Sequence, residues 1–522
     1  MGDWKNELAR IKTSLIINKM MKKVTSAQQK KGQHVSASSL SPVIGKQGRI
    51  PAFGTMFTPP VSPAGSLKKK IVLSEDFSFS GILTKIEEFK PPDIWVLRGE
   101  ELDYSGNKNG RILTVRLGID FGTAYTKVAY NIADKVYFVK WHGVRNTTEA
   151  ASFFLPCEMS ATEDKTFVLG RHSEQSEVLN NLKRPFLRDK PGEADSFAPI
   201  IIFVAWVFRY VRAWIYKEHE NIISGRKIVY QVNFGKPSSG FSWQNDDKYK
   251  KIVKSAWRLS QLKYKDFTMQ TAGNLLGQNI DENIGLDQLS LIPEFAAQVA
   301  GYAQSNQRED GLHMAFDIGA GTIDVSLFNL YGHPEEGEKI PIFSSEVQPL
   351  GTHFLMERRI CSSGMQIKWN NQHTSMSTDT FADCFNCDFN KIRACDDKFT
   401  EDVKLVLKSN LHFTRWRRYP LSPAWNNGLR TFIFGGGVHC KLYTNAIQDA
   451  FNEMHIKLLN MKHTYFDQND KEMLKNSNRL SVAYGLTFDR DVIGKIEEQD
   501  KNPDIVPEPE RLPPSWEDIY SK

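Results

Sequence analysis

Two short segments of this chain, 197 residues apart, follow the same pattern, and this repetition constrains the fold more than any other feature. The segment IDFGTAYTKV places Asp120 and Gly122 at the same spacing as Asp317 and Gly319 in FDIGAGTIDV. Each segment follows a short apolar run and precedes alternating apolar residues, which is typical of a strand, a tight turn and a second strand. The repeated hairpins therefore predict a chain built from two related halves.

The residues in these turns indicate phosphate binding. Glycine lets backbone N–H groups approach an anion closely, and Thr or Ser hydroxyls add further donors. An aspartate at the end of the first strand places a carboxylate beside that anion, which is sensible only with a divalent cation or an attacking water between them. We therefore expect Asp120 and Asp317 to flank one Mg²⁺. A third glycine cluster, FIFGGGVHCKLYTNAI at 432–447, supports this interpretation.

The length and composition predict an α/β protein with two large lobes. A chain of 522 residues is too long for one ordinary core, and a hydrophobic content of 40% excludes a fully disordered chain. Apolar strands alternate with helical segments from about residue 111 to 489. We expect a first lobe over 71–310, a second lobe with a return helix over 311–490, and a flexible, acidic, Pro-rich tail over 491–522.

The N-terminal region carries the basic charge of the chain. Residues 1–74 hold 13 Lys and Arg against 2 Asp and Glu, whereas the rest is slightly acidic. Residues 1–24 predict a basic amphipathic helix, and residues 25–70 a flexible linker rich in Ser, Pro and Lys. The helix could dock on the body of this chain, or residues 1–70 could bind a protein partner. A nucleic acid and a membrane surface are minor alternatives.

The cysteines indicate a reducing compartment. Six cysteines without a secretory pattern at the N-terminus fit a cytoplasmic protein. The longest apolar run, 198–208, has eleven residues, which is too short to span a membrane. The C-x2-C spacing of Cys384 and Cys387, with Cys395 nearby, leaves a structural Zn²⁺ site as a minor alternative to reduced, unliganded thiols.

Other nucleotide-binding motifs are missing from the sequence, since it contains neither a GxxxxGK[ST] loop nor the protein-kinase motifs. Instead, the two hairpins resemble the phosphate motifs of the actin-like ATPase superfamily, specifically of the nucleotide-binding domain of the seventy-kilodalton heat-shock chaperones. LIPEFAAQVAGY at 291–302 resembles the connecting helix of that family, the cluster at 432–447 its adenosine motif, and RLSVAYGLTF at 479–488 its second connecting helix. The order of the motifs agrees over about residues 113–490. The resemblance also implies that the apolar run at 198–208 forms a core helix, because the family has a buried helix before the strand that VYQVNFGKP resembles.

The resemblance implies a two-lobed actin-like ATPase fold of duplicated ribonuclease-H-like halves, with a flexible basic N-terminal extension. It also implies roles: carboxylates holding the Mg²⁺ water shell (Asp120 and Asp317), a glutamate ordering the attacking water (Glu294), and a lysine stabilising γ-phosphate charge (Lys183). The implied catalytic residues are Asp120, Lys183, Glu294, Asp317, Thr322 and Asp324. The implied contacts to ATP or ADP are Gly122, Thr123, Ala124, Tyr125, Gly319, Ala320, Gly321, Thr322, Gly351, Glu401, Lys404, Gly435, Gly436 and Gly437.

Departures from the family pattern keep alternatives open. Ala124 replaces a hydroxyl residue of the first turn, and Leu405 and Lys408 stand where the family has an arginine and a serine beside the adenine. About thirty residues follow the second connecting helix, too few for a β-sandwich peptide-binding domain. We therefore expect a chaperone-like ATPase without that domain, which slowly hydrolyses ATP with Mg²⁺ and switches a protein partner. A nucleotide-dependent filament or homo-oligomer, and a non-hydrolysing ATP-binding scaffold, are the alternatives.

Overall fold

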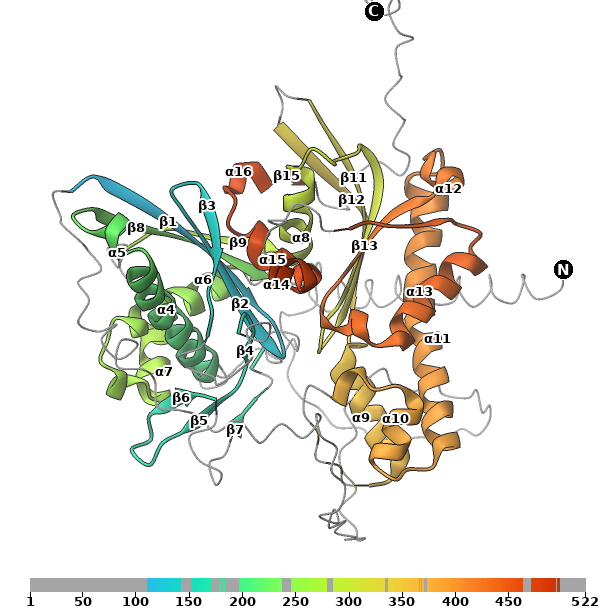
Figure 1. The fold of residues 1–522 in the computed structure, drawn as a ribbon, viewed down its shortest axis with the longest axis horizontal. Coiled ribbons are helices and arrows are strands. Elements are labelled where there is room, and N and C mark those ends of the chain that lie inside the picture. Colours follow the sequence, from blue (N-terminus) through green and yellow to red (C-terminus); the bar gives the residue numbers. More distant parts are fainter. Residues whose placement is uncertain are drawn as a thin grey trace, which may run out of the picture. The chain divides into compact units, whose positions relative to one another are not determined.

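The body of the protein is a mixed α/β structure with several sheets, shown in Figure 1. It belongs to the compact unit Phe79–Lys522, whereas the unit Met1–Ser78 lies outside the described residues. The predictions of a helix over 1–24 and a linker over 25–70 therefore fall outside them too. The computed structural model describes residues 110–141, 152–170, 178–180, 182–183, 197–236, 246–278, 285–333, 337–365, 367, 369, 373–462, 471–493 and 495–497.

The first sheet is built around the first hairpin. Its strands are β1 (Ile112–Phe121), β2 (Tyr125–Ile132), β3 (Lys135–Phe138), β4 (Leu155–Pro156), β8 (Lys227–Lys236) and β9 (Leu286–Pro293). The order is β3-β2-β1-β8-β9, with β4 pairing separately on β2. β1 and β2 are antiparallel, and so are β2 and β3. On the other side of β1, β8 and β9 are added in parallel. A small separate sheet contains β5 (Met159–Ala161), β6 (Phe167–Leu169) and β7 (Val178–Leu179).

The second sheet repeats this topology around the second hairpin. Its strands are β10 (Gly311–Ile318), β11 (Ile323–His333), β12 (Gly337–Gln348), β13 (Leu429–Phe434), β14 (Leu458–Asn460) and β15 (Lys495–Glu497). The order is β14-β13-β10-β11-β12-β15, in which β10, β11 and β12 are antiparallel and β13 and β14 are parallel additions beside β10. The two sheets thus share one strand order and one set of directions over five strands.

The first residues of the segment predicted as a flexible tail are ordered. Arg490–Ile493 forms the helix α16, and β15 pairs in parallel with the edge of β12. The edge strand offers unpaired backbone groups, which a short strand can satisfy whatever its composition. The prediction of a flexible tail is therefore wrong for residues 491–493 and 495–497, and residues 498–522 lie outside the described ones.

Helices cover the outer face of each sheet (Figure 1). Beside the first sheet lie α4 (Ala198–Glu218), α5 (Glu220–Ile223), α6 (Asp246–Ser260) and α7 (Met269–Gly277). Beside the second lie α9 (Thr352–Ser363), α10 (Thr378–Cys384), α11 (Phe389–Phe413), α12 (Ala424–Asn427) and α13 (Lys441–Glu453). Within α11, Phe399, Val403, Leu407 and Leu411 recur every three or four residues and are fully buried, so one stripe of this helix faces the core.

The apolar run at 198–208 lies in α4, whose 21 residues make it long and apolar enough to cross a membrane by length and composition. Most of this helix is nevertheless buried inside the protein. Its two arginines are held there as well, because Arg209 donates to the carbonyl of Leu262 at 2.8 Å and Arg212 to that of Ser260 at 2.9 Å. The run therefore forms a core helix, as predicted, within a helix longer than the run itself.

Two helices, α8 (Glu294–Ala303) and α15 (Ser477–Gly485), connect the sheets. α8 directly follows β9 of the first sheet, yet its side chains pack against β11 and β13 of the second. Conversely, α15 follows the strands of the second sheet and packs its buried face against β1 and β2 of the first. The two helices cross at Gly485, where a Cβ atom would overlap the carbonyl of Ala297. Each half thus gives one helix to the other half.

Candidate functional site

The first turn connects β1 and β2 and carries a buried carboxylate. Asp120 is 3% exposed and stands opposite Lys127 in the hairpin register, with the Lys127 Nζ 2.5 Å from its Oδ2. A Cβ on Gly122 would lie 2.5 Å from the carbonyl oxygen of Tyr125, so the turn requires glycine there. Cys157 fixes the turn from the side, because its Sγ donates to the Gly122 carbonyl at 3.0 Å.

The second turn connects β10 and β11 and carries a pair of carboxylates. Asp317 and Asp324 stand opposite each other in the register, and the Gly319 N–H donates to the Thr322 carbonyl at 2.9 Å to close the turn. The N-terminus of α9 docks on this turn, with the His353 N–H donating to the Ala320 carbonyl at 2.8 Å. Gly351, the N-cap of α9, and Gly321 complete this contact, and a Cβ at 351 would overlap the turn's backbone.

The third glycine cluster, at 435–437, packs against Asp317 and Ile318. Gly435 has a φ of +85°, and a Cβ there would overlap both the Asp317 carboxylate and the Ile318 carbonyl. The Gly435 N–H donates to the carbonyl of Asn478 at 3.0 Å, and the Asn478 amide donates back to the Gly435 carbonyl at 3.0 Å. Gly436 and Gly437 continue into a short 3₁₀ turn. The cluster therefore fixes α15 to the end of the strand that carries Asp317.

Glu294, the first residue of α8, lies near Asp317 and Asp324. Lys183 is 6% exposed and its Nζ donates to Glu294 Oε1 at 2.5 Å. One turn further along, the Gln298 amide donates to Asp317 Oδ2. Burial opposes the charge of Lys183, but the neighbouring Glu294 outweighs it, and the pKa of Lys183 is raised. The structure therefore joins the connecting helix to both the lysine and the second hairpin.

The carboxylates at this place outnumber the cations. Burial raises the pKa of Asp317 to about 7, and the negative charges of Glu294 and Asp120 act in the same direction. Burial, then Asp317, raises the pKa of Asp324 well above its usual range. Four carboxylates thus share the charge of two lysines, Lys127 and Lys183. Such crowding favours either protonation or the arrival of further positive charge.

The donor set fits a hydrated divalent cation. Among the described residues, the buried oxygens Asp120 Oδ2 and Asp324 Oδ1 lack a hydrogen-bond partner, Asp120 Oδ2 being near Lys127 without hydrogen-bond geometry. Mg²⁺ keeps several of its waters and is held by one or two carboxylates with substrate phosphates, so a full cage of protein ligands is not required. Within the same part of the chain, no three His, Cys, Asp or Glu side chains gather at metal-binding distance, Cys384, Cys387 and Cys395 included.

Glu401 and Lys404, implied to contact the adenosine, form a cluster of their own on α11. Lys404 Nζ lies 3.0 Å from Glu401 and 2.5 Å from Glu453 of α13, which also accepts from Lys408 at 2.8 Å. Leu405 is 57% exposed beside them. Glu453, which the sequence interpretation did not include, therefore pairs with both Lys404 and Lys408.

Sequence reasoning also missed three residues at the site: Lys127, Gln298 and Arg479. The hairpin register pairs Lys127 with Asp120, so counting residues across the predicted turn could have found it. Gln298 stands one turn after Glu294 on the same face of α8, which helical spacing could have indicated. Arg479 lies 3.7 Å above the ring centroid of Phe154 and 5.3 Å from that of Tyr125. No sequence signal marks this last contact, because it joins distant segments.

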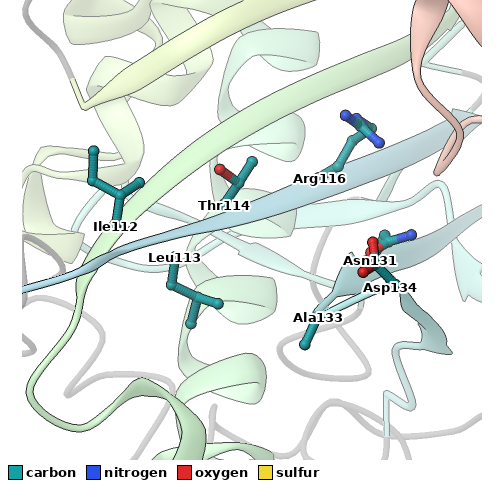
Figure 2. Close-up of a pocket in the computed structure, with 7 residues that line it drawn as sticks. All are labelled: Ile112, Leu113, Thr114, Arg116, Asn131, Ala133 and Asp134. Atoms are coloured by element: carbon teal, nitrogen blue, oxygen red, sulfur yellow. The ribbon is translucent and has the colours of Figure 1, made fainter.

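A shallow cavity of about 210 Å³ lies at the other end of β1, away from Asp120. Figure 2 shows its lining residues, which come from the start of β1 and from the turn between β2 and β3. Its arginine, Arg116, is engaged by Asp489 at 2.7 Å and by Gln231. This cavity contains none of the residues predicted for the site.

Comparison with known proteins adds no relative. No family model matches the chain, and no curated protein matches it significantly. The functional interpretation therefore depends on the arrangement of the residues themselves.

Proposed function

We propose that this protein binds a Mg²⁺-nucleoside triphosphate between its two repeated hairpins and slowly hydrolyses it, as a two-lobed protein of the actin-like ATPase type. One observation carries the proposal: Asp120 from the first turn, Asp317 and Asp324 from the second, and Glu294 from the connecting helix interact in one buried place. The motifs favour ATP as the nucleotide. The glycines of the three turns carry no side chain that would keep phosphate oxygens away from the backbone.

Asp120 and Asp317 would hold the hydrated Mg²⁺, with the unpaired oxygen of Asp324 accepting from a water of its shell. The ion, when bound, neutralises phosphate charge that the carboxylates would otherwise repel. Asp120 and Asp317 lie on opposite hairpins, so binding draws on both halves of the molecule. This use of both halves supports a nucleotide-dependent change in their arrangement.

Hydrolysis requires a water placed in line with the γ-phosphorus, and Glu294 is suited to orient it. Its carboxylate accepts a hydrogen bond from the water while the water oxygen forms a bond to phosphorus and the bond to the leaving ADP oxygen breaks, and the proton lost by the water ends on the released phosphate. Lys183, which now donates to Glu294, can donate to the γ-phosphate oxygens as negative charge builds up on them. Lys127, which now pairs with Asp120, is a second cation within reach of the same phosphates.

The test is nucleotide binding by the full chain with and without Mg²⁺, comparing wild type with Asp317→Ala. We expect Mg²⁺-dependent binding of ATP and ADP by the wild type and a loss of at least tenfold in affinity in the variant. Absence of any nucleotide binding by the wild type with Mg²⁺ would refute the proposal.

The same preparation separates the alternatives. Tight ATP binding without phosphate release above background would select a non-hydrolysing scaffold, and ATP-dependent sedimentation would select a filament. We propose a cytoplasmic protein partner as the receiver of the nucleotide signal, contacted through residues 1–70. Co-purification in the ATP state that is lost when residues 1–70 are deleted would support this.

A further inference from the structure

Arg479 differs in its surroundings from the other arginines that the core encloses. Arg359, for example, is neutralised by Asp396 at 2.7 Å, and Arg209 donates to a backbone carbonyl. The Arg479 guanidinium makes no hydrogen bond and no ion pair with any residue that the structure describes. Its guanidinium stacks on aromatic rings, which leaves its N–H groups without a hydrogen-bond partner among the described residues. A half-buried guanidinium with unused donors favours an anion.

The position of Arg479 is fixed by the elements of the candidate site. It follows Asn478, whose backbone and side chain are both bonded to Gly435, and Gly435 touches Asp317. A Cβ on Gly436 would lie 3.7 Å from the Arg479 Nε. On its other side is the ring of Tyr125, the first residue after the turn of the first hairpin. Arg479 therefore lies between the first turn and the third glycine cluster.

The described carboxylates do not compensate the charge of Arg479. Burial, followed by the charges of Arg479 and Lys475, lowers the pKa of His439. Burial also lowers the pKa of Arg479 itself, and no carboxylate contributes to that pKa. The first turn meanwhile lacks a side-chain donor at Ala124, next to the residue that Arg479 covers. The unpaired guanidinium of Arg479 thus stands beside the residue that follows Ala124.

We propose that Arg479 binds a phosphate oxygen of the nucleotide, supplying from α15 the donor that Ala124 cannot supply. This inference depends on the proposed nucleotide function, and it names a further residue that recognises the phosphate chain of the nucleotide. The planar fork suits two oxygens of one phosphate group, and the stack on Phe154 and Tyr125 fixes its direction in advance.

The experiment measures dissociation constants of the full chain for Mg²⁺-ATP and for Mg²⁺-tripolyphosphate, which lacks the nucleoside. We expect Arg479→Gln to weaken both ligands by the same factor, roughly 10- to 100-fold, because a charge-assisted hydrogen bond is lost. Arg479→Lys keeps the charge and loses the fork, so we expect an intermediate effect. The matched control is Arg430→Gln, which removes an arginine paired with Glu309 away from the turns, and should bind like the wild type.

The outcomes separate this inference from the proposed function. Unchanged ATP binding in Arg479→Gln, while Asp317→Ala loses it, would overturn the role of Arg479 and leave the proposed function intact. Weakened ATP with unchanged tripolyphosphate would place Arg479 at the nucleoside and overturn the phosphate assignment. A wild type that binds neither ligand would refute both. Unfolding temperatures of all variants show whether a loss follows from misfolding, and Arg479→Lys, which retains the stacked cation, still tests the role if Arg479→Gln is unstable.

Discussion

Lys127 and Lys183 each occupy a buried place and are each paired with one carboxylate. An ion pair removed from water gains little net stability, because desolvation offsets the attraction, yet removing one partner leaves an uncompensated charge. At this site the carboxylates exceed the lysines in number. Under the proposed function, each lysine would leave its carboxylate for a phosphate once a divalent cation has arrived, so binding would proceed by an exchange of partners.

Lys183→Met tests this exchange. We expect phosphate release to fall by a factor of about 100 or more, because the γ-phosphate loses its stabilising cation. The affinity for Mg²⁺-ATP should fall by less than about tenfold, since Lys127 and the three glycine turns remain. Single-turnover measurements of phosphate release beside equilibrium binding check both values. Lys254→Met on α6 is the matched control, and equal turnover in the two variants would contradict the role of Lys183.

The raised pKa of Asp317 predicts a pH dependence of stability without nucleotide. Asp317 faces Glu294, Asp120, Lys127 and Gln298, and its pKa is about 7. A carboxyl group whose pKa is raised on folding gives its full stability below pH 4, and this stability is lost as the pH rises through 7. Asp317→Asn lacks the ionisation, so its free energy of unfolding should improve relative to wild type by on the order of 3 kcal/mol between pH 4 and 7.

Urea unfolding of the two proteins at several pH values checks this expectation. A stability difference that stays constant from pH 4 to 7 would contradict it. Mg²⁺-ATP should reduce the pH dependence of the wild type, because it adds positive charge beside the carboxylate.

Much of the site could be anticipated at the residue scale. Asp120 and Asp317 follow from local patterns, because a turn fixes each carboxylate relative to its own strand, whereas Glu294 was implied by the resemblance of its helix. Arg479 and Glu453 could not be anticipated, because their neighbours come from segments distant in the sequence. Pairings of that kind are decided by tertiary packing, which local sequence patterns do not encode.

At the scale of elements, the hairpins were predictable from their alternating apolar residues, and the core helix α4 from the resemblance, which implies a buried helix there; α4 itself is buried on nearly all sides. β15 was not, because an acidic, Pro-rich composition concealed a strand whose hydrogen bonds come entirely from the edge of β12. The two helices α8 and α15 were expected from the sequence, whereas their contact at Gly485 depends on tertiary packing. Close approach of backbones at that glycine decides how the two helices meet.

Gly485→Ala tests the crossing. The added Cβ would meet the Ala297 backbone, so we expect a loss of about 3 kcal/mol in the free energy of unfolding. Gly273→Ala on α7 is the matched control, because a Cβ there meets nothing within 4 Å. It should stabilise the protein by about 0.5–1 kcal/mol through the lower entropy of the unfolded chain. Equal effects of the two substitutions in denaturant unfolding would contradict a tight crossing.

At the scale of the whole molecule, the chain divides into the units Met1–Ser78 and Phe79–Lys522, and the second unit holds the repeated sheets and their helices. We therefore expect the chain 79–522 to unfold within about 3 °C of the full chain and to bind Mg²⁺-ATP within twofold of it. Differential scanning calorimetry and nucleotide titration measure the two quantities. A large drop in either would show that residues 1–78 complete the body or the site.

The exchange of helices between the halves has a consequence for dividing the gene. A cut between residues 304 and 310 would separate each of these helices from the sheet that it covers. The first fragment would keep α8 without the second sheet, and the second fragment would keep α15 without the first sheet. We expect neither fragment to be soluble when expressed alone. Co-expression should restore the solubility of both fragments, because each supplies the helix that covers the other's sheet. Such reciprocal dependence makes this chain suitable for a split reporter.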